Sequence, residues 1–88
     1  MNAFLLSFIN NDQDEQIAKA MDIFPDWARL NNRTWIVLSN KKSTDVRSIV
    51  LEKTNQPVQF IVINITNSAW ASHGIDKEIT TWMKDRIK

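Results

Sequence analysis

The sequence predicts one α+β domain, in which a β-sheet is covered by helices. Four short segments are apolar throughout or alternate apolar and polar residues, which is typical of strands. Three other segments repeat apolar residues at helical spacing, two between strands and one after the last strand. The chain of 88 residues has the length of a single domain, residues 1–88.

The first predicted strand covers residues 3–9, AFLLSFI. Both of its faces are mostly apolar, so we expect both to be covered, as in a central strand. A helix follows, because one apolar stripe combines Ile17, Ala20, Met21 and Phe24.

The acids ahead of this helix suit its first turn. Asp12 is a suitable N-cap, and Glu15 would close a capping box three residues later. Asp14 adds negative charge where the helix dipole favours it. Pro25 ends the helix, because it disfavours helical geometry at Phe24.

The middle of the chain predicts a hairpin. Residues 26–30 and 34–39 form its strands, and Asn31-Asn32 suits the turn because asparagine tolerates positive φ. Trp35 lies within a predicted strand, so we expect it in the core.

The last third predicts a helix, a strand and a terminal helix. Ser43 would cap a helix over residues 44–54, and residues 58–65, VQFIVINI, give the strongest strand pattern. After a polar loop, the stripe of the last helix consists of Ile75, Ile79, Trp82 and Met83.

The order β-α-β-β-α-β-α predicts the ferredoxin-like βαββαβ fold, with an added C-terminal helix. Its two crossover helices would cover one face of a four-stranded antiparallel sheet. The second face is also apolar, so it needs the last helix or another subunit.

Composition excludes several classes of site. The net charge of +1 argues against a polybasic nucleic-acid protein, and the lack of cysteine excludes thiol chemistry. The single glycine rules out a Gly-rich phosphate loop. No apolar run approaches the roughly 18 residues of a membrane span, and the N-terminus lacks the features of a signal peptide. We therefore expect a cytoplasmic protein with no cofactor and no membrane partner.

Three segments carry a resemblance to a known family. They are Trp27 ahead of Thr34-Trp35-Ile36-Val37, the helix start at residues 44–47, and the Ile65–Trp70 turn, ITNSAW. In order and spacing they resemble the SinR-like family of small bacterial and phage proteins. That family is similar to the superfamily of the VapD endoribonucleases and the small CRISPR adaptation protein. The resemblance implies a ferredoxin-like fold and a homodimer built across the sheet.

The same resemblance places a nuclease aspartate at the end of the first strand, and this chain departs from it. The segment reads Ser7-Phe8-Ile9-Asn10, with Ile9 at the acid's position. Isoleucine neither binds Mg²⁺ nor takes a proton, so we expect no catalytic residue. The alternative is a displaced metal site, in which Asp12 and Asp14 of two subunits hold Mg²⁺.

Two further groups of residues have open roles. Trp27, Trp70 and Trp82 are candidates for core or dimer packing, since tryptophan is favoured at interfaces, and Trp27 or Trp70 could instead stack bases. Arg33, Lys41, Lys42 and Arg47 are either a solvated surface or contacts to nucleic-acid phosphates. The sequence thus predicts a homodimeric, non-catalytic binding module. A VapD-type endoribonuclease and a weak sequence-independent nucleic-acid binder remain the alternatives.

Overall fold

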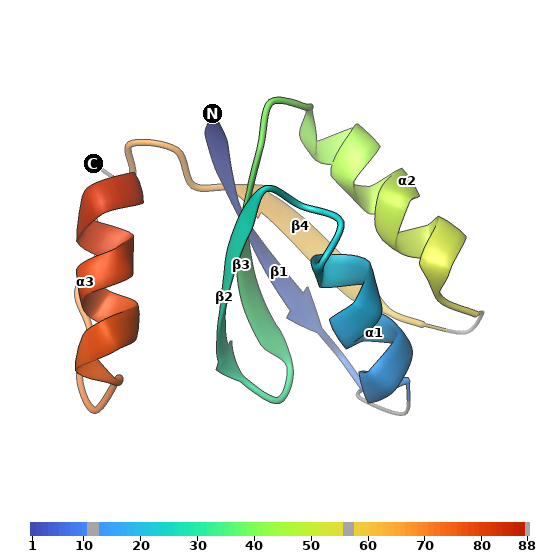
Figure 1. Cartoon of the computed structure of the whole chain (residues 1–88), viewed down its shortest axis with the longest axis horizontal. Helices are drawn as coiled ribbons and strands as arrows, with labels where there is room; N and C mark the ends of the chain where they lie inside the picture. Colours follow the sequence, from blue (N-terminus) through green and yellow to red (C-terminus); the bar gives the residue numbers. More distant parts are fainter. Residues whose placement is uncertain (11–12, 56–57, 88) are drawn as a thin grey trace.

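The structure is a computed structural model that describes residues 1–10, 13–55 and 58–87. Its element order is that expected from the sequence (Figure 1). The elements are β1 (Asn2–Phe8), α1 (Asp14–Met21), β2 (Asp26–Asn31), β3 (Thr34–Ser39), α2 (Ser43–Lys53), β4 (Phe60–Asn64) and α3 (Lys77–Arg86). Within these ranges no helix has the length and apolar character needed to cross a membrane.

The strands form one antiparallel sheet in the order β2-β3-β1-β4. This is the split arrangement predicted from the sequence, in which β3 lies between β1 and β2. The apolar strand β1 is central, with β3 on one side and β4 on the other. The strands β2 and β4 form the two edges.

Helices α1 and α2 cover one face of the sheet, which we call the first face (Figure 1). Alternation along β1 directs Phe4, Leu6 and Phe8 into it, where each is at most 2% exposed. The predicted core residue Trp35 is also buried there. The apolar stripes of the two helices supply the other side of this core, with Ile17, Ala20, Met21, Val46 and Val50. Phe24 is buried there too, but α1 ends at Met21, so Phe24 lies just after the helix and not in it as predicted.

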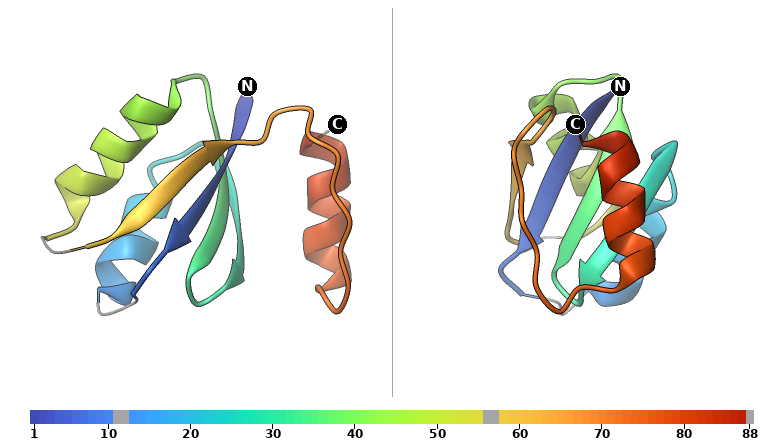
Figure 2. Two further views of the ribbon diagram at one scale, coloured as in Figure 1. Left: turned by 180° about the vertical axis from the view of Figure 1, so that it is seen from behind. Right: turned by 90° about the vertical axis from the view of Figure 1, so that its left-hand side faces the viewer.

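Helix α3 lies on the opposite side of the sheet, which we call the second face. Figure 2 shows that the loop before α3 runs alongside the helix, so that loop and helix form one thin layer. A smaller core forms there, in which Ala3, Ile36, Met83 and Ile87 are buried. An apolar cavity of about 180 Å³ remains between this layer and the sheet.

The helix starts differ from the predicted ones by one or two residues. The N-cap position of α1 is Gln13 and not Asp12, which lies outside the described residues. The Gln13 side chain is held by hydrogen bonds with the backbone N–H and C=O of Asn55. Helix α2 begins at Ser43 instead of being capped by it, because the Asp45 carboxylate accepts the Lys42 backbone N–H at 3.3 Å.

Candidate functional site

Asp14, which follows the end of β1, is held in an ion pair. The Asp14 carboxylate accepts a hydrogen bond from the Arg29 guanidinium, which reaches it across the first face from β2. Arg29 also donates to the carbonyl of Asn32 and lies over the Trp35 ring, 4.6 Å from its centroid. Asp14 therefore serves an ion pair between α1 and β2. Within the described ranges no three His, Cys, Asp or Glu side chains are grouped as metal ligands would be.

Ile9 lies on the second face and is exposed to solvent. Its backbone N–H donates to the Gln59 carbonyl at 2.8 Å, so the pairing of β1 with β4 continues one residue beyond β1. Alternation puts Ile9 on the same face as Leu5. Its side chain is 62% exposed, which is unusual for an isoleucine next to a central strand.

Ile61 and Ile63 of β4 extend this exposed apolar surface. They pair with Ser7 and Leu5 of β1, so all of them are on the second face. Ile61 is 54% exposed and Ile63 is 45% exposed. We call the set Ile9, Ile61 and Ile63 the isoleucine strip. It carries no charge, and apolar surface concentrated in this way is typical of interaction sites.

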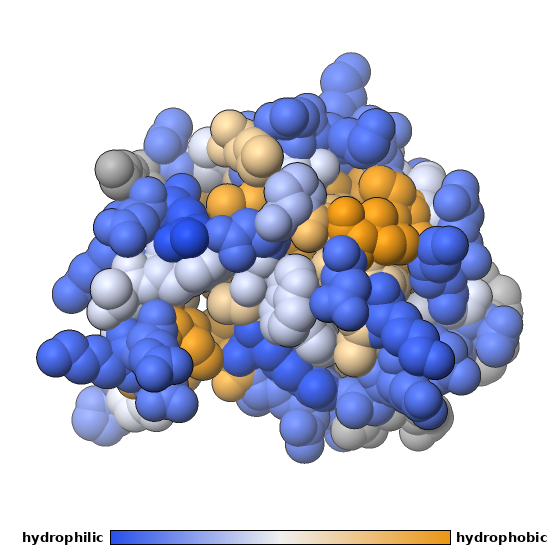
Figure 3. All heavy atoms as spheres, in the orientation of Figure 1, coloured by the Kyte–Doolittle hydropathy of each residue, from blue (hydrophilic) through white to orange (hydrophobic). Residues whose placement is uncertain are grey.

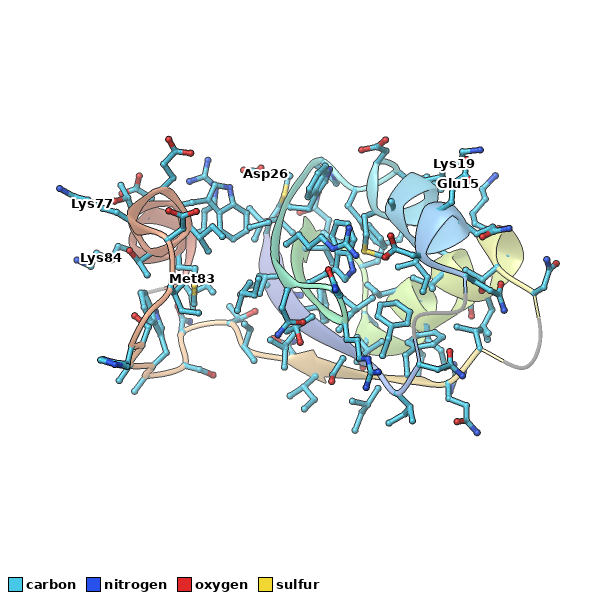
Figure 4. The ribbon with its side chains drawn as sticks, turned by 90° about the horizontal axis from the view of Figure 1, so that it is seen from below. Glu15, Lys19, Asp26, Lys77, Met83 and Lys84 are labelled. Atoms are coloured by element: carbon cyan, nitrogen blue, oxygen red, sulfur yellow. The ribbon has the colours of Figure 1, made fainter. Side chains whose placement is uncertain are left out.

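The strip is uncovered because α3 is anchored at the other edge of the sheet. Asp26, at the start of β2, accepts the Trp82 indole N–H at 3.1 Å and the Arg86 Nε–H at 2.6 Å. Arg86 also lies over the Trp82 ring, 4.8 Å from its centroid. Figure 4 shows Asp26 between the sheet and α3, with Met83 on the inner side of the helix and Lys77 and Lys84 on its outer side.

This anchor changes the acidity of Asp26. Partial burial raises the pKa of its carboxyl group, but the hydrogen bonds from Arg86 and Trp82 and the positive charge of Arg86 outweigh the burial. The pKa of Asp26 therefore lies below its ordinary value. The carboxylate stays ionised and holds α3 over β2 and β3.

The three candidate interface tryptophans have different positions. Trp82 and Trp70 are half-buried in the layer of α3, where the Trp70 indole N–H donates to the Ile87 carbonyl at 3.3 Å. Trp27 lies on the first face, 38% exposed, with its ring 5.3 Å from that of Trp35. Two of the three thus hold α3 in place, and Trp27 is the most accessible of them.

The four candidate nucleic-acid contacts are all exposed, but they do not form one cluster. Arg33 lies in the β2–β3 turn, whereas Lys41 and Lys42 follow the other end of β3. A strand of this length separates its ends by roughly 15–20 Å. Arg47, on α2, lines a groove of about 240 Å³ between α2 and β4.

Sequence reasoning did not single out Ile61 and Ile63. Their signal was the alternation in FIVIN, which places two isoleucines on one face of the strand. Their exposure depends on where α3 lies, and the local sequence does not specify that.

Comparisons with known proteins assign no family. No protein-family model matches the chain, and a search of curated proteins found no match. The SinR-like resemblance therefore remains a prediction.

Proposed function

We propose that this protein is a non-catalytic interaction module that associates with a second copy of itself through the isoleucine strip. The observation that carries the proposal is the isoleucine strip. An uncharged apolar strip is compatible with its own copy, because a two-fold interface brings the same surface together from both subunits. The strip also lies on the apolar face that the sequence predicts to be covered by the last helix or by another subunit.

The size of the isoleucine strip indicates how tightly two copies would associate. Fully burying an isoleucine contributes about 1.5–3 kcal/mol, so each half-exposed isoleucine contributes roughly 1 kcal/mol. Association has its own entropic cost of several kcal/mol. The strip alone therefore supports a weak dimer, and a tighter dimer needs further contacts.

Sedimentation equilibrium tests the proposal. From about ten to several hundred micromolar, we expect the mass to rise from that of the 10.2 kDa chain toward twice that value. The variant Ile61→Ser/Ile63→Ser should remain monomeric, and Leu51→Ser, an exposed leucine on α2, is the matched control. A wild-type protein that stays monomeric throughout this range would contradict the proposal.

The non-catalytic part rests on Ile9 and on the pairing of Asp14 with Arg29. Purified protein should leave RNA and DNA intact in Mg²⁺ or Mn²⁺. Cleavage that is lost in Asp12→Ala or Asp14→Ala would instead support the metal-dependent endoribonuclease. We keep the cytoplasmic location as part of this proposal.

Nucleic-acid binding is a second candidate, favoured by the exposed cations Lys41, Lys42 and Arg47 near the start of α2. Binding of a single-stranded oligonucleotide should weaken with salt, since each phosphate contact adds about 0.7 to the slope of log K against log salt. The triple alanine variant should lower that slope. Affinity that does not depend on salt would exclude this role for the three cations.

A further inference from the structure

Strand β4 is an open edge of the sheet, and the direction of its backbone groups follows from the register. The Ile9 N–H donates to the Gln59 carbonyl and the Ile65 N–H donates to the Ala3 carbonyl, both at 2.8 Å. Along a strand of an antiparallel pair, residues alternate between those whose backbone N–H and C=O point toward the partner strand and those whose groups point away from it. Gln59, Ile61, Ile63 and Ile65 therefore direct their backbone groups toward β1. The backbone groups of Phe60, Val62 and Asn64 point away from the sheet.

This edge lacks the features that usually prevent strand pairing. Protective edges carry lysine, proline or inward-pointing charges. The segment Phe60–Asn64 reads FIVIN and contains none of these. Helix α2 runs beside the edge, but a groove of about 240 Å³ lies between them, lined by Ser43, Thr44 and Arg47 on the side of α2. Arg47 is the one charged residue of that lining.

The segment is also symmetric about its centre. The backbone N–H and C=O of Val62 point away from the sheet, and the side chains of Ile61 and Ile63, on either side of it, lie on the second face. An antiparallel copy centred on Val62 would meet each outward N–H with a carbonyl and each outward carbonyl with an N–H. Phe60 would then pair with the partner's Asn64, and Val62 with the partner's Val62.

We propose that β4 pairs edge to edge with β4 of a second copy, antiparallel, with a two-fold axis at Val62. This inference rests on the proposed function, because it specifies how the two copies meet. It joins the two sheets into one and places Ile61 directly beside the partner's Ile63. The side chains of Ile61 and the partner's Ile63 then pack against each other across the joint and bury part of both strips. The backbone hydrogen bonds supply the contacts that these side chains alone lack.

Cysteine cross-linking tests the register directly. The chain has no cysteine, so Ile61→Cys and Ile63→Cys each introduce a single thiol. Directly opposite residues that are not hydrogen-bonded to each other have Cα atoms about 4.5 Å apart, within the range of a disulfide. Ile61 and the partner's Ile61 would be diagonal neighbours, about 7–8 Å apart, which is too far.

We therefore expect a disulfide-linked dimer when the two variants are mixed, and little when either is oxidised alone. With equal amounts, about half of the dimers are mixed, so up to about half of the chains should cross-link. Ile9→Cys, exposed on the same face but outside the proposed pair, controls for random oxidation. Equal cross-linking of the mixture and of each variant alone would overturn the proposed register.

A charge design separates this inference from the proposed function. In the proposed register, Ile61→Lys/Ile63→Glu places each lysine opposite the partner's glutamate, whereas Ile61→Lys/Ile63→Lys places like charges opposite each other. The first variant should keep the dimer in sedimentation and the second should lose it. If the wild type is dimeric but both variants are monomeric, only the edge pairing fails. If the wild type is monomeric at every concentration, both proposals fail, and the edge is left for a strand of a different protein.

Discussion

The two faces of the sheet are closed to different degrees. The first face packs against two helices and contains a core of fully buried residues, including Phe4, Leu6 and Trp35. The second face has one helix, a smaller core and a cavity of about 180 Å³. Deep, close-packed burial dominates stability, so the first face holds the fold together. The second face contributes less to stability and is the better candidate for binding.

The outer surface of α1 and α2 provides a second contrast. Figure 3, in the orientation of Figure 1, shows a largely hydrophilic surface with an apolar patch on the right, in the region of α1 and α2. Exposed Ile23 and half-buried Ile49 line a hollow on this side, together with Asn40 and Lys41. Unlike the isoleucine strip, this surface includes a charged side chain, that of Lys41. Exposed isoleucines therefore mark different surfaces on the two sides of the molecule.

The largest effect on the free energy of unfolding is expected from a comparison of two adjacent leucines on opposite faces, Leu5 and Leu6. Leu6→Ala should destabilise the protein by about 2–5 kcal/mol, because Leu6 is fully buried in the first face. Leu5→Ala should cost only about 1 kcal/mol, because Leu5 is half-exposed and borders the cavity. Urea unfolding of the two variants measures the difference. Equal losses would mean that the two faces contribute equally to stability.

A second prediction concerns Met83, the buried residue of α3. Met83→Ala should cost about 1–2 kcal/mol, less than a typical core deletion, because the helix rests on a loosely packed layer. Hydrogen exchange should show loss of protection in α3 while α1 keeps its own, since locally weak elements open on their own. Loss of protection spread evenly over α1 and α3 would show that α3 belongs to the same cooperative unit as the first face.

The anchor at Asp26 predicts a pH dependence. Because its pKa is lowered in the folded protein, Asp26 contributes stability above its ordinary pKa of about 4. That contribution is lost as the pH falls through the lower pKa of the folded state. The Trp82 indole N–H signal in NMR should shift over this acid range. In Asp26→Asn the shift should be absent; a shift that persists would assign it to another group.

The smallest effect on stability is expected from the substitution of Asp14. Its ion pair with Arg29 is partly exposed, and such pairs contribute no more than about 1 kcal/mol. Asp14→Asn should therefore lower stability only slightly. Adding Mg²⁺ should leave the melting temperature of the wild type unchanged. A rise with Mg²⁺ that Asp14→Asn abolishes would indicate a bound cation, by linkage.

Most of the fold could be predicted because its signals are local. Alternation along β1 and the helical stripe beginning at Ile17 each specify an element and its buried face. The strand order then follows from the element order. The helix starts were predicted less well, because Asp12 and Ser43 look like suitable caps next to the positions that the structure uses. The contact that fixes the start of α1 joins Gln13 to Asn55, 42 residues away in sequence.

The candidate site depends even more on distant contacts. Trp82 was predicted from its helical spacing, but its partner Asp26 is 56 residues away in sequence. The contacts of Trp82 and Arg86 with Asp26 hold α3 over the β2 side of the second face, which leaves Ile61 and Ile63 exposed. No pattern within a short window carries this information.

The central position of β1 affects how the protein is synthesised. Strand β1 is synthesised before both of the strands that pair with it, β3 and β4. Its neighbour β3 begins at Thr34, and β4 begins only at Phe60. An emerging chain therefore carries the apolar segment NAFLLSF without hydrogen-bonded neighbours until β3 has been made. Apolar surface and unpaired strand groups that are exposed in this way make a chain prone to aggregation, so we expect β1 to be the vulnerable segment until β4 pairs with it.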